Sequence, residues 1–88
     1  MKYCVYILKD DNDVFYIGST NNLERRMSQH KNKYTKTTAR MNNPKLVLFQ
    51  EYNSLAMARS VELRIKKLKR KDYVEKMIKD GYIRIKSD

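Results

Sequence analysis

The chain has 88 residues and a formal net charge of +10, from 20 lysine and arginine residues against 10 aspartate and glutamate residues. This length allows one domain with a modest core and excludes a second, so we expect a single domain over residues 1–88. A charged fraction of 34% with few glycines or prolines favours a compact, helix-rich soluble protein over a disordered one. The single cysteine, Cys4, excludes an internal disulfide or a cysteine metal site.

The excess of positive charge predicts a polyanionic partner. Nucleic acid is the commonest partner of this kind, and an anionic membrane surface is the second possibility that composition leaves open. No apolar run approaches the length of a membrane span, and no signal peptide precedes Lys2. We therefore expect a cytoplasmic protein that does not act in a membrane.

Residues 2–8 are expected to form the first strand, because apolar side chains occupy both alternating sets of positions. A strand that is buried on both faces belongs in the interior of a sheet. The polar run over residues 9–13 favours a turn, from which a second strand returns antiparallel. A three-residue loop over residues 10–12 would place Tyr6 opposite Tyr16, whereas a four-residue loop would put the two rings on opposite faces.

The second strand covers residues 14–17, which are all β-branched or aromatic. We expect the chain to turn at Gly18 and then to begin a helix. Asn21 is the expected cap of this helix, because Glu24 three residues later completes a capping box.

Three side chains near this strand-to-helix segment suggest a site. Arg26 and His30 are four residues apart on one helix face, and the end of the strand brings Tyr16 near them. Each also has an ordinary structural explanation: a half-buried strand tyrosine, a solvated arginine, and a histidine favoured by the helix dipole. We expect Tyr6 and Tyr16 to share one sheet face and to be directed toward Arg26, which requires an even register or a bulge in the hairpin.

Residues 31–45 are predicted to form a basic loop, because no periodicity is sustained and Pro44 disfavours a helix before it. Cations interleaved with an aromatic ring and hydroxyl groups suit phosphate contact and stacking. A solvated surface loop is the alternative. The residues of this loop that are expected to contact nucleic acid are Lys31, Lys33, Tyr34, Lys36 and Arg40.

The remainder of the chain predicts a strand and two helices. The strand covers residues 46–52, and the first helix runs over residues 55–69 with an apolar stripe at helical spacing. A second, shorter helix begins at a capping signature headed by Asp72 and ends at Gly81, where a left-handed cap is expected.

A carboxylate, Glu62, falls within the arc of the apolar stripe on the longer helix. Burying a bare carboxylate is costly, so Glu62 must be paired, hydrogen-bonded or bound to a metal. An arginine partner is the ordinary explanation. Arg64 and Lys67 face outward on the same helix and are candidates either for nucleic-acid contact or for solubility alone.

The sequence resembles a known family at these same positions. Residues 4–6, Cys-Val-Tyr, followed by residues 16–18, Tyr-Ile-Gly, resemble the two tripeptides that name the GIY-YIG nuclease superfamily. The resemblance continues through Arg26, His30 and Glu62, and it is greatest to small stand-alone members. It implies an α/β (α+β) fold, a three-stranded antiparallel sheet flanked by helices. The order expected along this chain is strand-strand-helix-strand-helix-helix.

The resemblance also implies metal-dependent hydrolysis of DNA phosphodiester bonds, with one Mg²⁺ or Mn²⁺ held by Glu62. It makes Tyr16 the candidate general base, with Tyr6 bonded to the attacking water or to a phosphate oxygen. Arg26 would bind the phosphate, and His30 would position the phosphate or relay protons.

Two departures from the family pattern are visible. Cys4 replaces the glycine of the first tripeptide, and residues 71–79 contain no asparagine where many members carry one.

We expect an endonuclease directed by DNA structure, or by a protein partner, in repair or recombination. A non-catalytic basic nucleic-acid-binding module is the alternative. A carboxylate on the inward side favours the enzyme, because binding alone has no use for a negative charge beside a phosphate.

Overall fold

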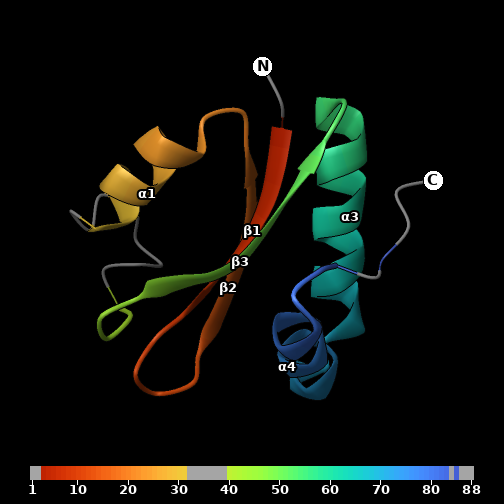
Figure 1. Ribbon diagram of the computed structural model, residues 1–88. Coiled ribbons are helices and arrows are strands. Elements are labelled where there is room, and N and C mark those ends of the chain that lie inside the picture. The colour runs from red at the N-terminus through yellow and green to blue at the C-terminus, as the bar shows by residue number, and fades with distance from the viewer. Residues whose placement is uncertain (1–2, 32–39, 84, 86–88) are drawn as a thin grey trace.

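The protein folds as an antiparallel sheet between two helical layers (Figure 1). The computed structural model describes residues 3–31, 40–83 and 85. The sheet order is β2-β1-β3, so β2 and β3 are the edge strands. The predicted fold is confirmed, with elements β1 (Tyr3–Lys9), β2 (Phe15–Thr20), α1 (Leu23–Lys31), β3 (Lys45–Tyr52), α3 (Leu55–Leu68) and α4 (Lys71–Asp80).

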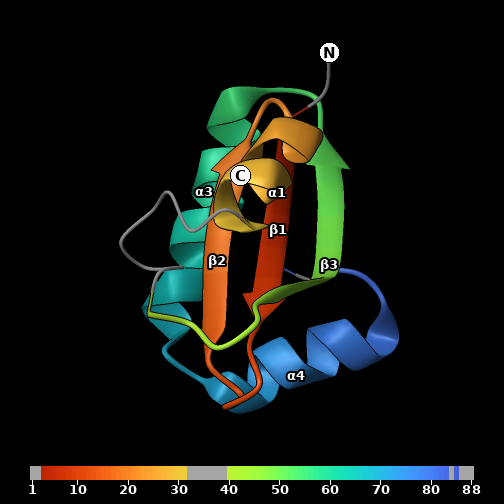
Figure 2. The same ribbon diagram turned by 90° about the vertical axis from the view of Figure 1, so that its left-hand side faces the viewer.

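The helices divide between the two faces of the sheet. Helix α1 covers one face, and α3 and α4 cover the other. Figure 2 shows that α1 lies over β1 and β2 and leaves β3 uncovered on that face. In the part of the chain that the structure describes, no helix is long and apolar enough to cross a membrane.

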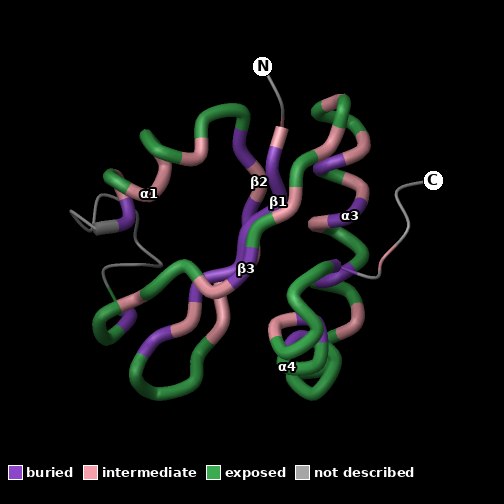
Figure 3. Tube along the Cα trace, viewed as in Figure 1, coloured by how far each residue is buried: buried purple, intermediate pink, exposed green. Residues whose placement is uncertain are grey.

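The central strand β1 is buried on both faces, as its composition predicts (Figure 3). Its alternate side chains enter two separate apolar clusters, because neighbouring strand residues point to opposite faces. The cluster under α3 and α4 contains Val5, Ile7, Leu48, Ala58, Val61, Ile65, Val74 and Met77. The cluster under α1 contains Tyr6, Leu8 and Met41, with Tyr16, Leu23 and Met27 packed against it.

The register of the first hairpin differs from the predicted one. Leu8 pairs with Tyr16, and Tyr6 pairs with Gly18, so the two tyrosines are diagonal neighbours on one face. Both loop lengths that the sequence favoured are wrong, because Lys9 pairs with Phe15 and five residues separate these two. The shared face is nevertheless confirmed, because adding two residues to a three-residue loop preserves the alternation of the strand.

Two local predictions after the second strand are also wrong. Strand β2 continues through Gly18 to Thr20, so the chain does not turn at the glycine. The helix cap is Asn22 rather than Asn21, since the Asn22 side-chain oxygen accepts the Arg25 N–H at 3.0 Å. The Thr20 hydroxyl oxygen in turn accepts the Asn22 N–H at 3.0 Å, which places the cap one residue later.

At the C-terminal end, one predicted cap is confirmed and one is wrong. Gly81 ends α4 in a left-handed conformation with φ of 82°. Asp72 does not cap α4, because its carboxylate accepts a hydrogen bond of 2.8 Å from the Arg70 guanidinium. The following segment is docked on the sheet, since the N–H of buried Ile83 donates to the Gln50 side-chain oxygen at 2.8 Å.

The long hairpin loop is organised by the buried carboxylate of Asp10. One of its oxygens accepts the N–H groups of Asn12 at 2.9 Å and of Val14 at 2.8 Å. The other accepts the Asn42 N–H at 3.1 Å, which joins the loop to the segment before β3. Burial raises the pKa of Asp10, but these N–H donors and Lys71 outweigh burial, so the pKa is lowered overall.

Replacing Asp10 by asparagine is therefore expected to lower the melting temperature at neutral pH, because an amide NH₂ group must then face an N–H donor. A carboxyl whose folded pKa is lowered stabilises the fold above its unfolded pKa of about 3.9, and this contribution disappears as pH falls through the folded value. Thermal melting from pH 7 to pH 2 should show that Asp10→Asn loses less stability in acid than the parent. Asp11→Asn, at an exposed neighbour, is the matched control; equal acid sensitivity in parent and Asp10→Asn would contradict this account.

Candidate active site

The site is built on a close contact between Tyr6 and Gly18. A Cβ atom at position 18 would lie 2.5 Å from the Tyr6 hydroxyl oxygen and 2.7 Å from its Cζ atom. It would also lie 3.1 Å from a ring carbon of Tyr16. The Tyr6 side chain is only 1% exposed, so the ring has little freedom to move aside. Glycine is thus required at this position by the close approach of a phenol to the backbone.

His30 completes a cluster of three rings on this face. The Tyr6 hydroxyl and His30 Nε2 are hydrogen-bonded at 2.9 Å, and His30 is 2% exposed. The ring centroids are 6.1 Å apart for Tyr6 and Tyr16, and 5.1 Å apart for Tyr16 and His30. Helix α1 supplies the histidine from its last turn, while β1 and β2 supply the tyrosines. Three of the predicted site residues therefore lie together.

Burial and charge keep both bonded groups neutral. Burial raises the pKa of Tyr6 well above the ordinary range of a phenol, Tyr16 and Glu62 raise it further, and the Arg26 charge opposes them. Burial and then Arg26 lower the pKa of His30. The Nδ1 atom of His30 is buried and has no hydrogen-bond partner among the described residues. A neutral imidazole can accept the Tyr6 proton at Nε2 when the ring proton is on Nδ1.

Arg26, on α1, lines a cavity of about 220 Å³ at the end of β2. Ser19 from β2 and Arg59 from α3 line the same cavity, so two arginines from opposite helical layers border it. The remaining lining residues are Tyr3, Thr20, Asn21 and Leu55. Guanidinium groups match the oxygens of a phosphate, and two of them suit an anion at this place.

The structure places Glu62 on the α3 side of the sheet, with both carboxylate oxygens bonded. The Ser19 hydroxyl donates to Oε1 at 2.5 Å, and Lys66 Nζ donates to Oε2 at 2.6 Å. The ordinary alternative, an arginine partner, is replaced by a lysine: the partner is Lys66, whose side chain is 47% exposed while that of Glu62 is 16% exposed. Ser19 directly follows Gly18 on an edge strand, so the carboxylate and the phenols lie on opposite faces of the same piece of β2.

The donor set around Glu62 can fit one divalent cation. Among the described residues, no group of three or more histidine, cysteine, aspartate or glutamate side chains could hold a metal. A single carboxylate suits Mg²⁺, which keeps several waters and takes further oxygens from a phosphate. The Lys66 ammonium now lies on Oε2, where its side chain is 47% exposed, so a bound cation would take the place of this ammonium.

The predicted nucleic-acid contacts are more scattered than the ring cluster. Arg40 is exposed next to the segment before β3, and Arg64 and Lys67 are exposed on α3. At 100° per residue, these two α3 positions lie on a different arc of the helix from Glu62. Lys31 ends α1, and its side chain, together with Lys33, Tyr34 and Lys36, lies outside the described residues.

Sequence reasoning missed Ser19, Arg59 and Lys66. Ser19 could have been found from strand alternation, because it follows Gly18 and must point to the opposite face from Tyr6. Arg59 and Lys66 stand at i−3 and i+4 from Glu62, which places all three on one arc of α3.

A ββαβαα domain with a tyrosine pair, an arginine, a histidine and a separate helix glutamate defines a fold of the nuclease type. Residues 2–77 match the model of the GIY-YIG catalytic domain, and the chain belongs to this family, among its UPF0213 proteins. It is 43% identical over 70 residues to a UPF0213 protein of Clostridium perfringens, covering 75% of this chain and 72% of that protein.

Two further relatives support the same placement. A UPF0213 protein from the VLF1-GP41 intergenic region of Autographa californica nuclear polyhedrosis virus is 58% identical over 31 residues. That match covers 35% of this chain and 30% of the viral protein. The solution NMR structure of a UPF0213 protein from Bacillus halodurans superposes with a TM-score of 0.59 at 28% identity, covering 92% of this chain and 87% of that one.

Replacing Gly18 by alanine is expected to lower the unfolding free energy by about 1–3 kcal/mol, the usual cost of overpacking a filled site. A double-mutant cycle with Tyr6→Phe, measured by chemical denaturation, tests the cause. Gly18→Ala should lower the unfolding free energy by less in the Tyr6→Phe background, because the hydroxyl oxygen nearest to the new Cβ atom is then absent. An equal cost in both backgrounds would show that the hydroxyl contact is not responsible.

His30 is expected to titrate below its ordinary pKa of 6.5. Because it is the single histidine of the chain, its imidazole C–H resonances identify it in an NMR titration. Arg26→Gln should raise the midpoint, since a repelling positive charge is removed. The unfolding free energy should fall as pH drops below about 6.5, because His30 binds its proton at a higher pH in the unfolded chain than in the folded protein. A midpoint at or above 6.5 would contradict the buried, neutral imidazole.

Proposed function

We propose that this protein is a divalent-metal-dependent endonuclease that hydrolyses DNA phosphodiester bonds. The observation that carries the proposal is the Gly18–Ser19 step of β2. Gly18 admits the Tyr6 phenol on one face, and Ser19 holds the Glu62 carboxylate on the other. Proton-transfer groups and a candidate metal ligand therefore border the same short piece of β2 from its two faces. Family membership supports a nuclease-type activity on nucleic acid.

Tyr16 is proposed as the general base: its hydroxyl proton first passes to bulk water, and the phenolate that remains takes the proton of the attacking water. Tyr16 is less buried than Tyr6 and lies within ring contact of both Tyr6 and His30. The raised pKa of Tyr6 makes that phenol a poor base by itself. The neutral Tyr6 hydroxyl donates a hydrogen bond to His30 Nε2, which leaves the Tyr6 oxygen free to accept a hydrogen bond from the attacking water and to orient it.

Arg26 is proposed to bind the phosphate and to neutralise the charge that develops on it, and Arg59 borders the same cavity from the other helical layer. Glu62 is proposed to hold one Mg²⁺ or Mn²⁺. When bound, such an ion supplies charge stabilisation for the leaving oxygen. Ser19 fixes one carboxylate oxygen, which orients the other toward the solvent side where Lys66 now lies.

Residues 2–77 match the catalytic domain. We propose that DNA structure, or a protein partner, directs the cleavage in repair or recombination. A non-catalytic nucleic-acid-binding module is the second candidate, and the Glu62–Lys66 ion pair favours it, because the carboxylate already has a cationic partner in the protein.

Replacing Glu62 by glutamine separates the two functions. Cleavage of labelled duplex, flap, branched and single-stranded DNA in Mg²⁺ or Mn²⁺ should fall by roughly 100-fold or more. Affinity for DNA in EDTA should hold or rise, because a negative charge near the phosphate is gone. The melting temperature should change little, since an exposed lysine partner contributes only about 0–1 kcal/mol.

Glu75→Gln, at an exposed position on α4, is the matched control and should cleave like the parent. A parent that cleaves none of these substrates in either metal would sink the nuclease proposal. A Glu62→Gln variant that cleaves normally would remove Glu62 from the proposed mechanism.

A further inference from the structure

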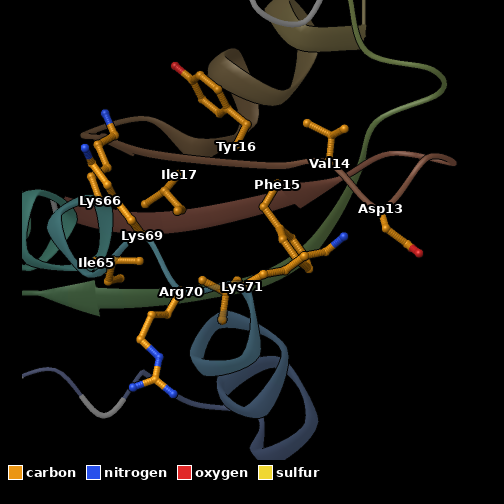
Figure 4. Close-up of a pocket in the computed structure, with 11 residues that line it drawn as sticks. Asp13, Val14, Phe15, Tyr16, Ile17, Ile65, Lys66, Lys69, Arg70 and Lys71 are labelled. Carbon is orange, nitrogen blue, oxygen red and sulfur yellow. The ribbon is translucent and has the colours of Figure 1, made fainter.

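A groove of about 530 Å³ runs along the free edge of β2 on the α3 and α4 side (Figure 4). Its floor is apolar, and its outer rim carries four cationic side chains. The floor residues and these cations are distinct from the ring cluster of Tyr6, Tyr16 and His30. The floor contains Phe15, Ile17, Ile65 and Val74, and the cations are Lys66, Lys69, Arg70 and Lys71. The groove also borders Tyr16, a member of the ring cluster, and Lys66, the partner of Glu62.

The cations of the groove continue a stripe that includes the candidate site. Arg59, Glu62, Lys66 and Lys69 follow one another at three- or four-residue spacing. At 100° per residue they fall within an arc of about 80° on the side of α3 next to β2. The rise of about 1.5 Å per residue makes the stripe about 15 Å long, which matches roughly four nucleotides at 3.4 Å of axis each.

The backbone at Lys69 is unusual for a lysine. This residue ends α3 with φ of 49°, a left-handed conformation in which glycine is normally favoured. The conformation turns the chain into α4 and places consecutive basic residues on the groove. Lys69 adopts a left-handed backbone conformation that glycine would adopt with less strain, and its side chain lines a cationic groove. This combination suggests that the charge of Lys69 has a role.

The four cations differ in how strongly other side chains already engage them. Arg70 is bonded to Asp72 at 2.8 Å, and Figure 4 shows its guanidinium directed away from Lys66 and Lys69. Lys66 and Lys69 extend in the same direction as each other. The Lys71 ammonium lies 5.7 Å from the centre of the Phe15 ring. Lys66 shares its charge with Glu62, which leaves Lys69 and Lys71 as the cations best placed to contact a ligand.

One carboxylate stands in the groove lining, and it does not reverse the local charge. Asp13 lies at the hairpin end, where Lys9 Nζ contacts its Oδ1 at 3.2 Å. The remaining charge of the lining is positive. A repeating anion with apolar parts between its charges fits an apolar floor with a cationic rim, and a nucleic-acid strand has this chemistry.

We propose that this groove binds the phosphodiester backbone of the nucleic-acid strand beside the candidate active site, with Lys69 and Lys71 as its phosphate contacts. The inference rests on the proposed function for the identity of the ligand, but its test does not require cleavage. Lys69→Gly combined with Lys71→Ala removes both charges and replaces the left-handed lysine by the residue that its conformation favours. The melting temperature should change little, because the glycine relieves the left-handed backbone at position 69 while the alanine removes the Lys71 charge near Asp10 and Phe15.

The matched control is Lys76→Ala combined with Lys79→Ala, which removes the same charge from exposed positions of α4 outside the groove. DNA affinity is measured in EDTA from about 50 to 200 mM salt by fluorescence anisotropy. The groove variant should bind about tenfold or more weakly than the control, and its slope of log affinity against log salt should be shallower by about 1.8. Equal affinity and equal slope in the two variants would overturn the proposal.

A second probe tests the other polyanion that composition leaves open. Vesicles containing anionic lipid are titrated with the same two variants. Loss of vesicle binding in the groove variant with unchanged DNA affinity would overturn the proposal. Loss of DNA affinity alone supports it, even if the parent protein cleaves no substrate, so failure of the nuclease proposal is distinguishable from failure of the groove.

Discussion

The close approach of the Tyr6 phenol to the backbone of Gly18 is the constraint on which the candidate site depends. A side chain at position 18 would overlap the phenol, so the glycine lets a large ring pack directly against the neighbouring strand. This packing brings the hydroxyl to His30 and the ring to Tyr16. Because neighbouring strand residues face opposite ways, it also directs Ser19 to the layer where Glu62 is held.

The candidate groups are therefore divided between two layers that meet at one strand edge. The phenols, the imidazole and Arg26 belong to the α1 side, whereas Glu62, Lys66 and the groove cations belong to the α3 side. A small molecule on one face would contact one of these sets. An extended polyanion that crosses the edge of β2 would contact both. Under the proposed function, this arrangement would select its ligand by shape as well as by charge.

Helix α3 determines how the two sets are placed relative to each other. Its buried residues Ala58, Val61 and Ile65 pack against the sheet, and Glu62 lies on the adjacent arc beside the edge strand. Apolar packing therefore fixes the position of a charged side chain that makes only exposed or half-buried polar contacts itself. Changes in this packing would displace the carboxylate from Ser19 without touching any candidate catalytic group.

The sequence was sufficient for the element order and for the buried central strand, because both follow from local periodicity and composition. The hairpin loop was not predictable, since its length depends on Asp10 bonding to Asn42, thirty-two residues away. The partner of Glu62 was missed because i, i+4 pairing with an exposed lysine was not weighed against a buried arginine. The groove depends on the left-handed backbone of Lys69, which no glycine marks in the sequence.

The Glu62–Lys66 pair is consistent with the proposal that a carboxylate stands beside a bound phosphate in so basic a protein. Cations at i−3 and i+4 surround Glu62 with more positive than negative charge, which reduces its repulsion of a nearby anion. The pair itself is weak, because Lys66 is close to half exposed and water screens it. A weak pair neutralises the carboxylate while holding neither partner strongly, so each side chain remains available to another ligand. A buried arginine in place of Lys66 would have fixed both charges and left Glu62 with a structural role alone.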